Sequence, residues 1–149
     1  QTTMAAVSKD LGEHITELQG EVDTHGTKAA AAADVGAIAA LDGPHRTAAL
    51  GVLTKLDEMV AHMGTCMNDS KASPDMMTCK DAMAKLKTAT EGHAATMAAI
   101  TGLTAARAEE VRHGKELSDQ LALMKAHSDS LAGSANLYMC SQQNMGSGH

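Results

Sequence analysis

The sequence predicts an all-α protein that folds as an antiparallel, up-down-up-down four-helix bundle with a long first helix and a short C-terminal tail. The 149 residues suit one domain. Apolar residues recur at three- and four-residue steps along most of the chain. Phe and Trp are absent and Tyr138 is the only aromatic residue, which disfavours an all-β fold. Residues 1–132 are expected to form the bundle and residues 133–149 the tail, packed back on its lower end.

The first helix is expected over about Thr3–Leu41. The alanine run 29–33 continues it with strong helix-forming residues, and Gly26 offers an alternative break. Asp42-Gly43-Pro44 is expected to end this helix and to begin the next one, because proline suits the first turn of a helix. The inward stripe of this helix consists of Met4, Val7, Leu11, Ile15, Leu18 and Val22.

The second helix is expected over about Pro44–Asn68, followed by a loop at 69–72. The third begins at Ser73-Pro74-Asp75, which combines a capping hydroxyl, a first-turn proline and an acid at the positive end of the helix dipole. The inward positions of the second helix are Ala49, Leu53, Leu56, Val60, Met63 and Met67. Those of the third helix are Met76, Cys79, Met83, Leu86, Thr90, His93, Met97 and Ile100.

The third helix is expected to end near Thr101 and the fourth to span about Ala105–Ala132. Gly102 can take the left-handed capping conformation, and Thr104 can cap the next helix. A helix that continues through this point is the alternative, because no proline interrupts it. The inward positions of the fourth helix are Leu117, Leu121, Met124 and Leu131.

Composition excludes several classes of function. The net charge of −6 and the pI near 5.7 argue against nucleic-acid binding, as does the lack of aromatic side chains for base stacking. No apolar run approaches the roughly 20 residues that span a bilayer. A covalent haem motif, a glycine-rich phosphate loop and a Gly-x-Ser-x-Gly elbow are all absent from the sequence.

The cysteines favour an oxidising compartment. Cys66 and Cys79 flank a short polar loop, as a stapling disulfide would, and Cys140 is then left over. Numbering that opens at Gln1 fits a chain matured by removal of a signal peptide. We therefore expect a periplasmic or secreted protein.

Counting residues from each turn predicts which histidines lie at the same level of the bundle, at about 1.5 Å per residue. With the first turn at residues 42–44, His25 falls level with about residue 60. His25, His62 and His127 are then expected to share a layer in the lower half. His93 and His113 lie at equal distances from the upper turn and are expected to form a second layer.

The lower half is also rich in sulfur, since it holds all three cysteines and all but one of the methionines. Thioether, thiol and imidazole together select Cu(I) and related soft cations. The expected thioether ligands are Met59, Met63, Met83 and Met124. The ordinary alternative is that methionine fills gaps in a core without Phe. His14 and His45 are expected to be solvated.

A second constellation contains a carboxylate. Glu110-Val111-Arg112-His113 is a Glu-x-x-His step, which resembles the motif of carboxylate-bridged di-iron bundles of the ferritin-like type. Those bundles carry it on two helices, whereas this sequence shows one copy.

Three hypotheses follow. The first is a metal-binding bundle, most plausibly for copper, which captures the ion with His, Met and Cys ligands and performs no catalysis. The second is a sensing or interaction module without metal, which binds a protein partner or a second copy of itself. The third is a di-iron or haem metalloprotein centred on Glu110, His113 and His93.

Overall fold

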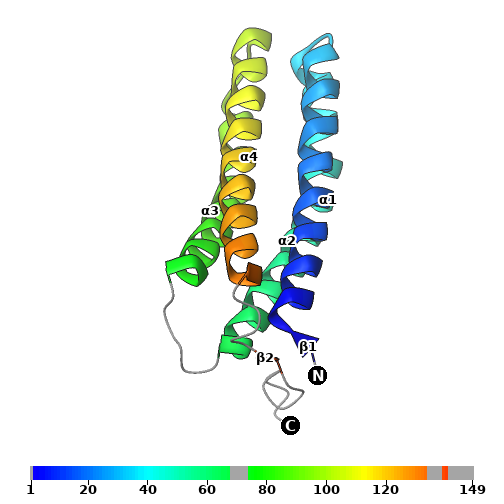
Figure 1. Cartoon of the computed structure of the whole chain (residues 1–149). Coiled ribbons are helices and arrows are strands. Elements are labelled where there is room, and N and C mark those ends of the chain that lie inside the picture. Colours follow the sequence, from blue (N-terminus) through cyan, green and yellow to red (C-terminus); the bar gives the residue numbers. More distant parts are fainter. Residues whose placement is uncertain (1, 68–73, 134–138, 141–149) are drawn as a thin grey trace.

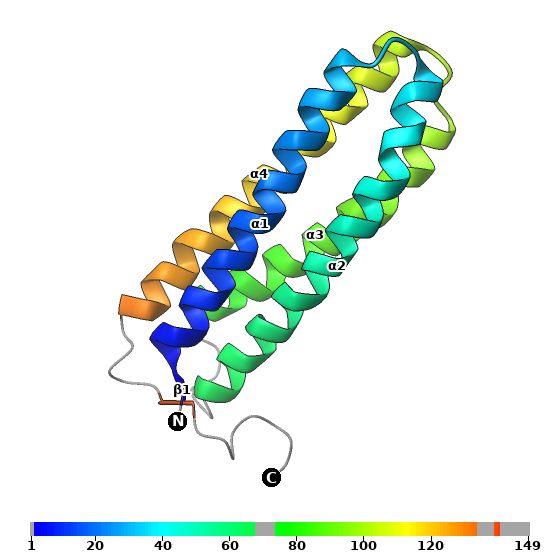
Figure 2. The same cartoon turned by 90° about the vertical axis from the view of Figure 1, so that its right-hand side faces the viewer.

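The computed structural model describes residues 2–67, 74–133 and 139–140, with side chains at positions 6–63 and 74–130. Four helices account for nearly all of this region: α1 (Met4–Ala31), α2 (Val35–Met67), α3 (Pro74–Ala98) and α4 (Leu103–Gly133). They run up and down alternately, and each packs against two neighbours in the order α1, α2, α3, α4 around the bundle (Figures 1 and 2). The predicted all-α four-helix bundle is confirmed.

Two short strands join the ends of the chain at the lower end of the bundle. β1 (Thr2–Thr3) pairs antiparallel with β2 (Met139–Cys140), with Thr2 opposite Cys140 and Thr3 opposite Met139. The first and last described residues of the chain, Thr2 and Cys140, therefore lie at this end (Figure 1). None of the described helices is long and apolar enough to cross a lipid bilayer.

The first turn lies about ten residues earlier than the sequence predicts. α1 ends at Ala31, and Asp34 caps α2 by accepting a hydrogen bond from the Ala37 N–H at 2.7 Å. Arg107 also donates to the carbonyl of Ala32 at 2.7 Å, which satisfies a group left free at the end of α1. The predicted end of the first helix near Leu41 is therefore wrong, and α2, with 33 residues, is the longest of the described helices.

Pro44 lies inside α2 and not at its start. An interior proline removes one backbone hydrogen bond, but α2 is held on both sides of it. Ile38 is fully buried before the proline, and Ala49 and Leu53 are buried after it. Burial of these apolar side chains offsets the lost hydrogen bond.

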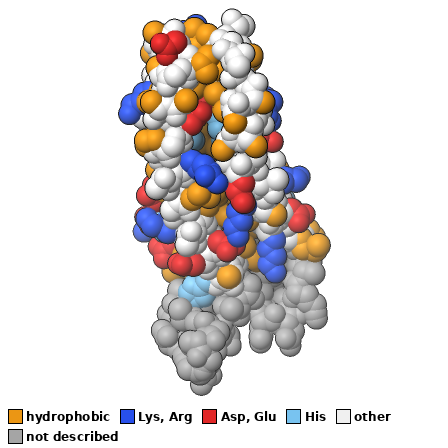
Figure 3. All heavy atoms as spheres, turned by 180° about the vertical axis from the view of Figure 1, so that it is seen from behind, with side chains coloured by type: hydrophobic (Ala, Val, Ile, Leu, Met, Phe, Trp, Pro, Cys, Tyr) orange, Lys and Arg blue, Asp and Glu red, His pale blue; other side chains and the backbone are white. Residues whose placement is uncertain are grey.

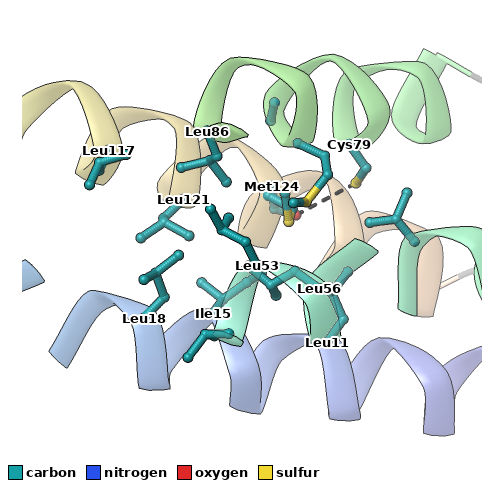
Figure 4. Packing of buried hydrophobic residues seen from close by; sticks show 14 of the residues in the cluster. Leu11, Ile15, Leu18, Leu53, Leu56, Cys79, Leu86, Leu117, Leu121 and Met124 are labelled. Atoms are coloured by element: carbon teal, nitrogen blue, oxygen red, sulfur yellow. Dashed lines mark hydrogen bonds between the residues drawn. The ribbon is translucent and has the colours of Figure 1, made fainter. Parts of the chain in front are cut away.

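The apolar interior is divided into two parts. A large lower cluster contains Leu11, Leu18, Leu56, Leu86 and Leu121 together with buried Val, Ile and Met side chains (Figure 4). A small upper cluster forms around Ile38, Ala32 and Ala106. The inward positions predicted for the four helices are buried wherever side chains are described, with one exception. At the upper end of the third helix, Met97 and Ile100 are half-buried.

Candidate metal centre

A layer of buried polar side chains separates the two apolar clusters. All four helices contribute to it, and every member except Glu21 and Asp42 is at most 7% exposed. We refer to it as the polar layer; its members are Glu21, His25, Asp42, His45, His93, Glu109, Glu110 and His113.

Helix lengths bring these residues to one level. His25 lies six residues before the end of α1, and Asp42 lies seven residues after the start of α2. His93 lies five residues before the end of α3, and Glu110 seven residues after the start of α4. At about 1.5 Å per residue, all four lie roughly 8–11 Å below the upper turns.

Two carboxylates occupy the centre of the layer, between two imidazoles. His25 Nε2 is 2.9 Å from Glu110 Oε1 and 2.9 Å from Asp42 Oδ1. On the other side, His93 Nε2 is 3.3 Å from Glu110 Oε2 and 3.7 Å from Asp42 Oδ1. Glu110 thus faces each imidazole with a different oxygen.

Each of these imidazoles stacks on a second one. The His25 and His45 ring centroids are 3.9 Å apart with an interplanar angle of 7°. The His93 and His113 centroids are also 3.9 Å apart, at 3°. The predicted neighbourhood of His93 and His113 is confirmed. His45, expected to be solvated, is buried instead, because the turn that would have exposed it lies ten residues away.

Outer carboxylates hold two of the rings. His45 Nδ1 donates to Glu21 Oε2 at 2.9 Å, and His93 Nδ1 donates to Glu109 Oε2 at 2.9 Å. Arg112 in turn donates to both oxygens of Glu109, at 2.7 and 2.8 Å. Such a carboxylate fixes the orientation and tautomer of an imidazole and raises its basicity as a ligand.

The charges of the layer are set by competition between burial and pairing. Burial favours neutral imidazole, but hydrogen bonds to the carboxylates dominate and raise the pKa of His25 to about 9 and of His93 to about 10. His113 has no such partner, so burial and the nearby His93 cation lower its pKa to about 3. Hydrogen bonds from Arg112 lower the pKa of Glu109 to about 2. The layer therefore holds cationic and neutral imidazoles side by side.

The layer has an internal two-fold pattern. His25 and His93, Asp42 and Glu110, and His45 and His113 are each separated by 68 positions. The helical hairpin α1–α2 therefore contributes a histidine, a carboxylate and a second histidine to the layer, in the same order and at the same spacing as the hairpin α3–α4. Asp42-Gly43-Pro44-His45 is the second copy of the carboxylate-x-x-His step, with Asp in place of Glu.

Several atoms of the layer lack hydrogen-bond partners. Both carboxylate oxygens of Asp42 and Nδ1 of His113 are buried. Asp42 Oδ1 is held by its ion pair with His25, whereas Asp42 Oδ2 and His113 Nδ1 make no hydrogen bond among the described residues. His25, Asp42 and Glu110 each place one ligand atom within 4.8 Å of the others, close enough to hold one ion. Unpaired buried polar atoms are costly unless a ligand satisfies them.

The structure does not bring together the three imidazoles of the predicted lower layer. His25 lies beside Glu110, whereas His127 lies 17 residues further along α4, about 25 Å away. There His127 Nδ1 donates to Asp75 Oδ1 at 2.7 Å. His62 is half-buried on α2, and its helix position also places it in the lower half. The misplaced first turn explains the error.

The predicted sulfur ligands lie in the apolar core. Met63, Met83 and Met124 are fully buried in the lower cluster, and Met59 is half-buried against it. Cys79 is a free thiol whose Sγ lies 3.8 Å from the carbonyl oxygen of Met124 (Figure 4). Cys79 faces the core from α3 and forms no disulfide, in contrast to the predicted pairing with Cys66. The side chains of Cys66 and Cys140 lie outside the described residues.

Sequence reasoning found four residues of the polar layer as candidate ligands, His25, His93, Glu110 and His113, but assigned His25 to another level. Asp42 is predicted in a turn and His45 at a solvated helix start, so neither is a predicted ligand, and neither are the outer carboxylates Glu21 and Glu109. The signal that could have found the first two is the common 68-residue spacing of the histidine pairs. Glu21 lies four residues before His25 on the same helix, but its partner in the structure is His45; no local pattern marks Glu109.

Comparison with known proteins gives no relative for this arrangement. No protein-family model matches the chain, and no curated protein and no solved structure shows significant similarity to it.

Proposed function

We propose that the polar layer binds a pair of transition-metal ions bridged by Asp42 and Glu110. His25, His45, His93 and His113 would supply the imidazole ligands of the two ions. One observation carries this proposal: two buried carboxylates lie between two pairs of imidazoles, and Glu110 turns a separate oxygen to each side.

A purely structural network accounts less well for the layer. Burying carboxylates and imidazoles in a bundle core is costly unless every polar atom is satisfied. Here Asp42 Oδ2 and His113 Nδ1 make no hydrogen bond among the described residues. Metal ions would satisfy these atoms and offset the negative charge of the carboxylates.

The donor set favours borderline metal ions. Imidazole and carboxylate ligands without sulfur suit iron, manganese, cobalt, zinc and Cu(II). The arrangement resembles ferritin-like di-metal bundles in its two carboxylate-x-x-His steps. It departs from them because His25 and His93 stand on the helices where that pattern has glutamates.

Metal titration tests the proposal directly. Apo-protein is titrated with Fe(II), Mn(II), Co(II), Zn(II) and Cu(II) against a competing chelator, and elemental analysis is expected to give two ions per chain. Asp42→Asn and Glu110→Gln should each lower the affinity by at least 100-fold. Asp75→Asn is the matched control, because it removes a carboxylate that also bonds an imidazole but lies outside the layer.

The outcomes separate the hypotheses. Unchanged binding in Asp42→Asn and Glu110→Gln would place the metal elsewhere. Failure of the wild-type protein to bind any of these ions would remove the dinuclear proposal and favour a sensing or protein-interaction module without metal.

A second candidate function is Cu(I) capture in the lower half of a periplasmic or secreted protein, as the sulfur content predicts. It is supported by the presence of Met63, Met83, Met124 and Cys79 in one buried cluster. Burial raises the pKa of the Cys79 thiol to about 11, so that this residue is a protonated thiol near neutral pH in the absence of copper. Cu(I) titration of Met124→Leu tests this candidate, with weaker binding expected if the thioether is a ligand.

A further inference from the structure

A surface groove between α3 and α4 reaches the polar layer. It has a volume of about 400 Å³, and His93 forms part of its lining. Gly92 also lines the groove, and a Cβ atom placed there would meet no other atom within 4 Å, so a larger side chain at this position has room to extend into the groove. A molecule in this groove would therefore lie next to the ring of a proposed metal ligand.

The charge of the groove favours an anion. Lys85 and Arg112 line it together with one carboxylate, that of Glu116, so the lining residues carry one net positive charge. Arg112 is paired with Glu109 and Glu116, but Lys85 makes no ion pair among the described residues.

The corresponding groove between α1 and α2 has the opposite character. Its charged lining residues are Glu17, Glu21 and Lys55, with one net negative charge. It also contains none of the six proposed ligands and reaches only the outer carboxylate of Glu21. The two-fold pattern of the layer is thus broken at its surface.

The proposed ligand set leaves room for such an anion. With two imidazoles and one oxygen from each bridging carboxylate, each ion would have four protein donors. Iron and manganese commonly take more than four ligands, so coordination positions stay open for an exogenous molecule.

We infer that the α3–α4 groove admits a small, singly charged anion, which coordinates the metal pair beside His93. This inference rests on the proposed dinuclear centre. The burial of the layer limits the ligand to a few atoms, and Lys85 supplies the charge that attracts it.

Azide is the probe. It is mixed rapidly with protein whose bound iron has first been oxidised to Fe(III) with ferricyanide, and the azide-to-Fe(III) charge-transfer absorbance is followed. In Gly92→Leu the leucine side chain would fill the groove, and we expect the association rate to fall at least 10-fold with unchanged iron content. Leucine favours a helix more than glycine does, so this variant should fold.

Two variants serve as controls. Gly92→Ala adds only a methyl group at the same position and should bind azide at nearly the wild-type rate. Gly51→Leu places the same side chain in the α1–α2 groove, where a Cβ also meets no atom within 4 Å, and should not slow binding.

The alternative route is visible from another side. Figure 3 shows the molecule from the side opposite to Figure 1. A histidine and an acidic side chain lie at the bottom of the furrow between the two helices nearest the viewer. If azide associates with Gly92→Leu at the wild-type rate, it enters through the furrow of Figure 3 and not through the α3–α4 groove, and the inference is overturned. An equal fall in all three variants would also overturn it. Bound iron without an azide band would overturn it while leaving the dinuclear centre intact, whereas absence of bound iron would overturn both.

Discussion

Replacing Glu109 by glutamine tests how the polar layer holds its metal ligands. Glu109 accepts the Nδ1–H of His93 at 2.9 Å, and Arg112 fixes it through two further hydrogen bonds. Glutamine keeps the size of the side chain but removes its charge. The His93 ring then loses the carboxylate that orients it and increases its basicity.

The expected magnitude follows from that single contact. Loss of a carboxylate partner of a metal-bound imidazole typically weakens metal binding 10–100-fold, or about 1.4–2.7 kcal/mol. Glu109 is buried, so water cannot replace it easily. Glu21→Gln should have a smaller effect, because the Glu21 side chain is 32% exposed and solvent can substitute in part.

The assay is competition with a chromophoric chelator for Zn(II) or Co(II), with circular dichroism to confirm that each variant is folded. Glu17→Gln is the matched control. It also removes a glutamate bonded to an imidazole, that of His14, but this pair lies on the exposed surface. An affinity of Glu109→Gln within twofold of the wild type would refute the idea that Glu109 positions a metal ligand.

Further predictions concern stability and reactivity. The hydrogen bond from His127 lowers the pKa of Asp75 in the folded state. Asp75 therefore contributes stability above pH 4, and this stability is lost as the pH falls through the folded-state pKa. In urea unfolding, Asp75→Asn should lower the free energy of unfolding by roughly 0.5–1 kcal/mol at pH 7 and by less at pH 3. Leu53→Ala should lower the free energy of unfolding by about 2–5 kcal/mol, since this side chain is almost fully buried; a loss below 1 kcal/mol would contradict the packing. With the other two cysteines replaced by alanine, Cys79 should react with a thiol reagent only at the rate of unfolding, because it is buried and its pKa is about 11. Fast reaction in the native protein would show that it is accessible.

Much of the fold could be predicted because periodicity reports it directly. The stripe from Met76 to His93 marks the buried face of α3, and Ser73-Pro74-Asp75 marks its start within one residue. The first turn was wrong because two local signals compete there. The alanine run 29–33 favours a continuing helix, whereas Asp34 acts as a cap, and propensity alone does not show that Pro44 is tolerated inside α2.

The error in the position of the first turn changes which residues are predicted to meet in the candidate site. The predicted turn placed His25 level with about residue 60, whereas the actual turn places it beside Asp42. The difference is about 18 residues, or roughly 27 Å along a helix. The Glu-x-x-His step at Glu110 was recognised, but its partner Asp42-x-x-His45 was hidden in the segment taken as a turn.

The sequence by itself determined that the chain is helical, which faces of its helices are buried, and that imidazoles and carboxylates recur at helical spacing. These properties depend on neighbours within one or two turns of the same helix. Only the tertiary structure decided that His25, Asp42, His93 and Glu110 meet at one level while the sulfur atoms pack among leucines. The reason is geometric: contacts between antiparallel helices depend on where each turn falls, and every residue of error at a turn shifts the facing side chains by about 3 Å relative to each other.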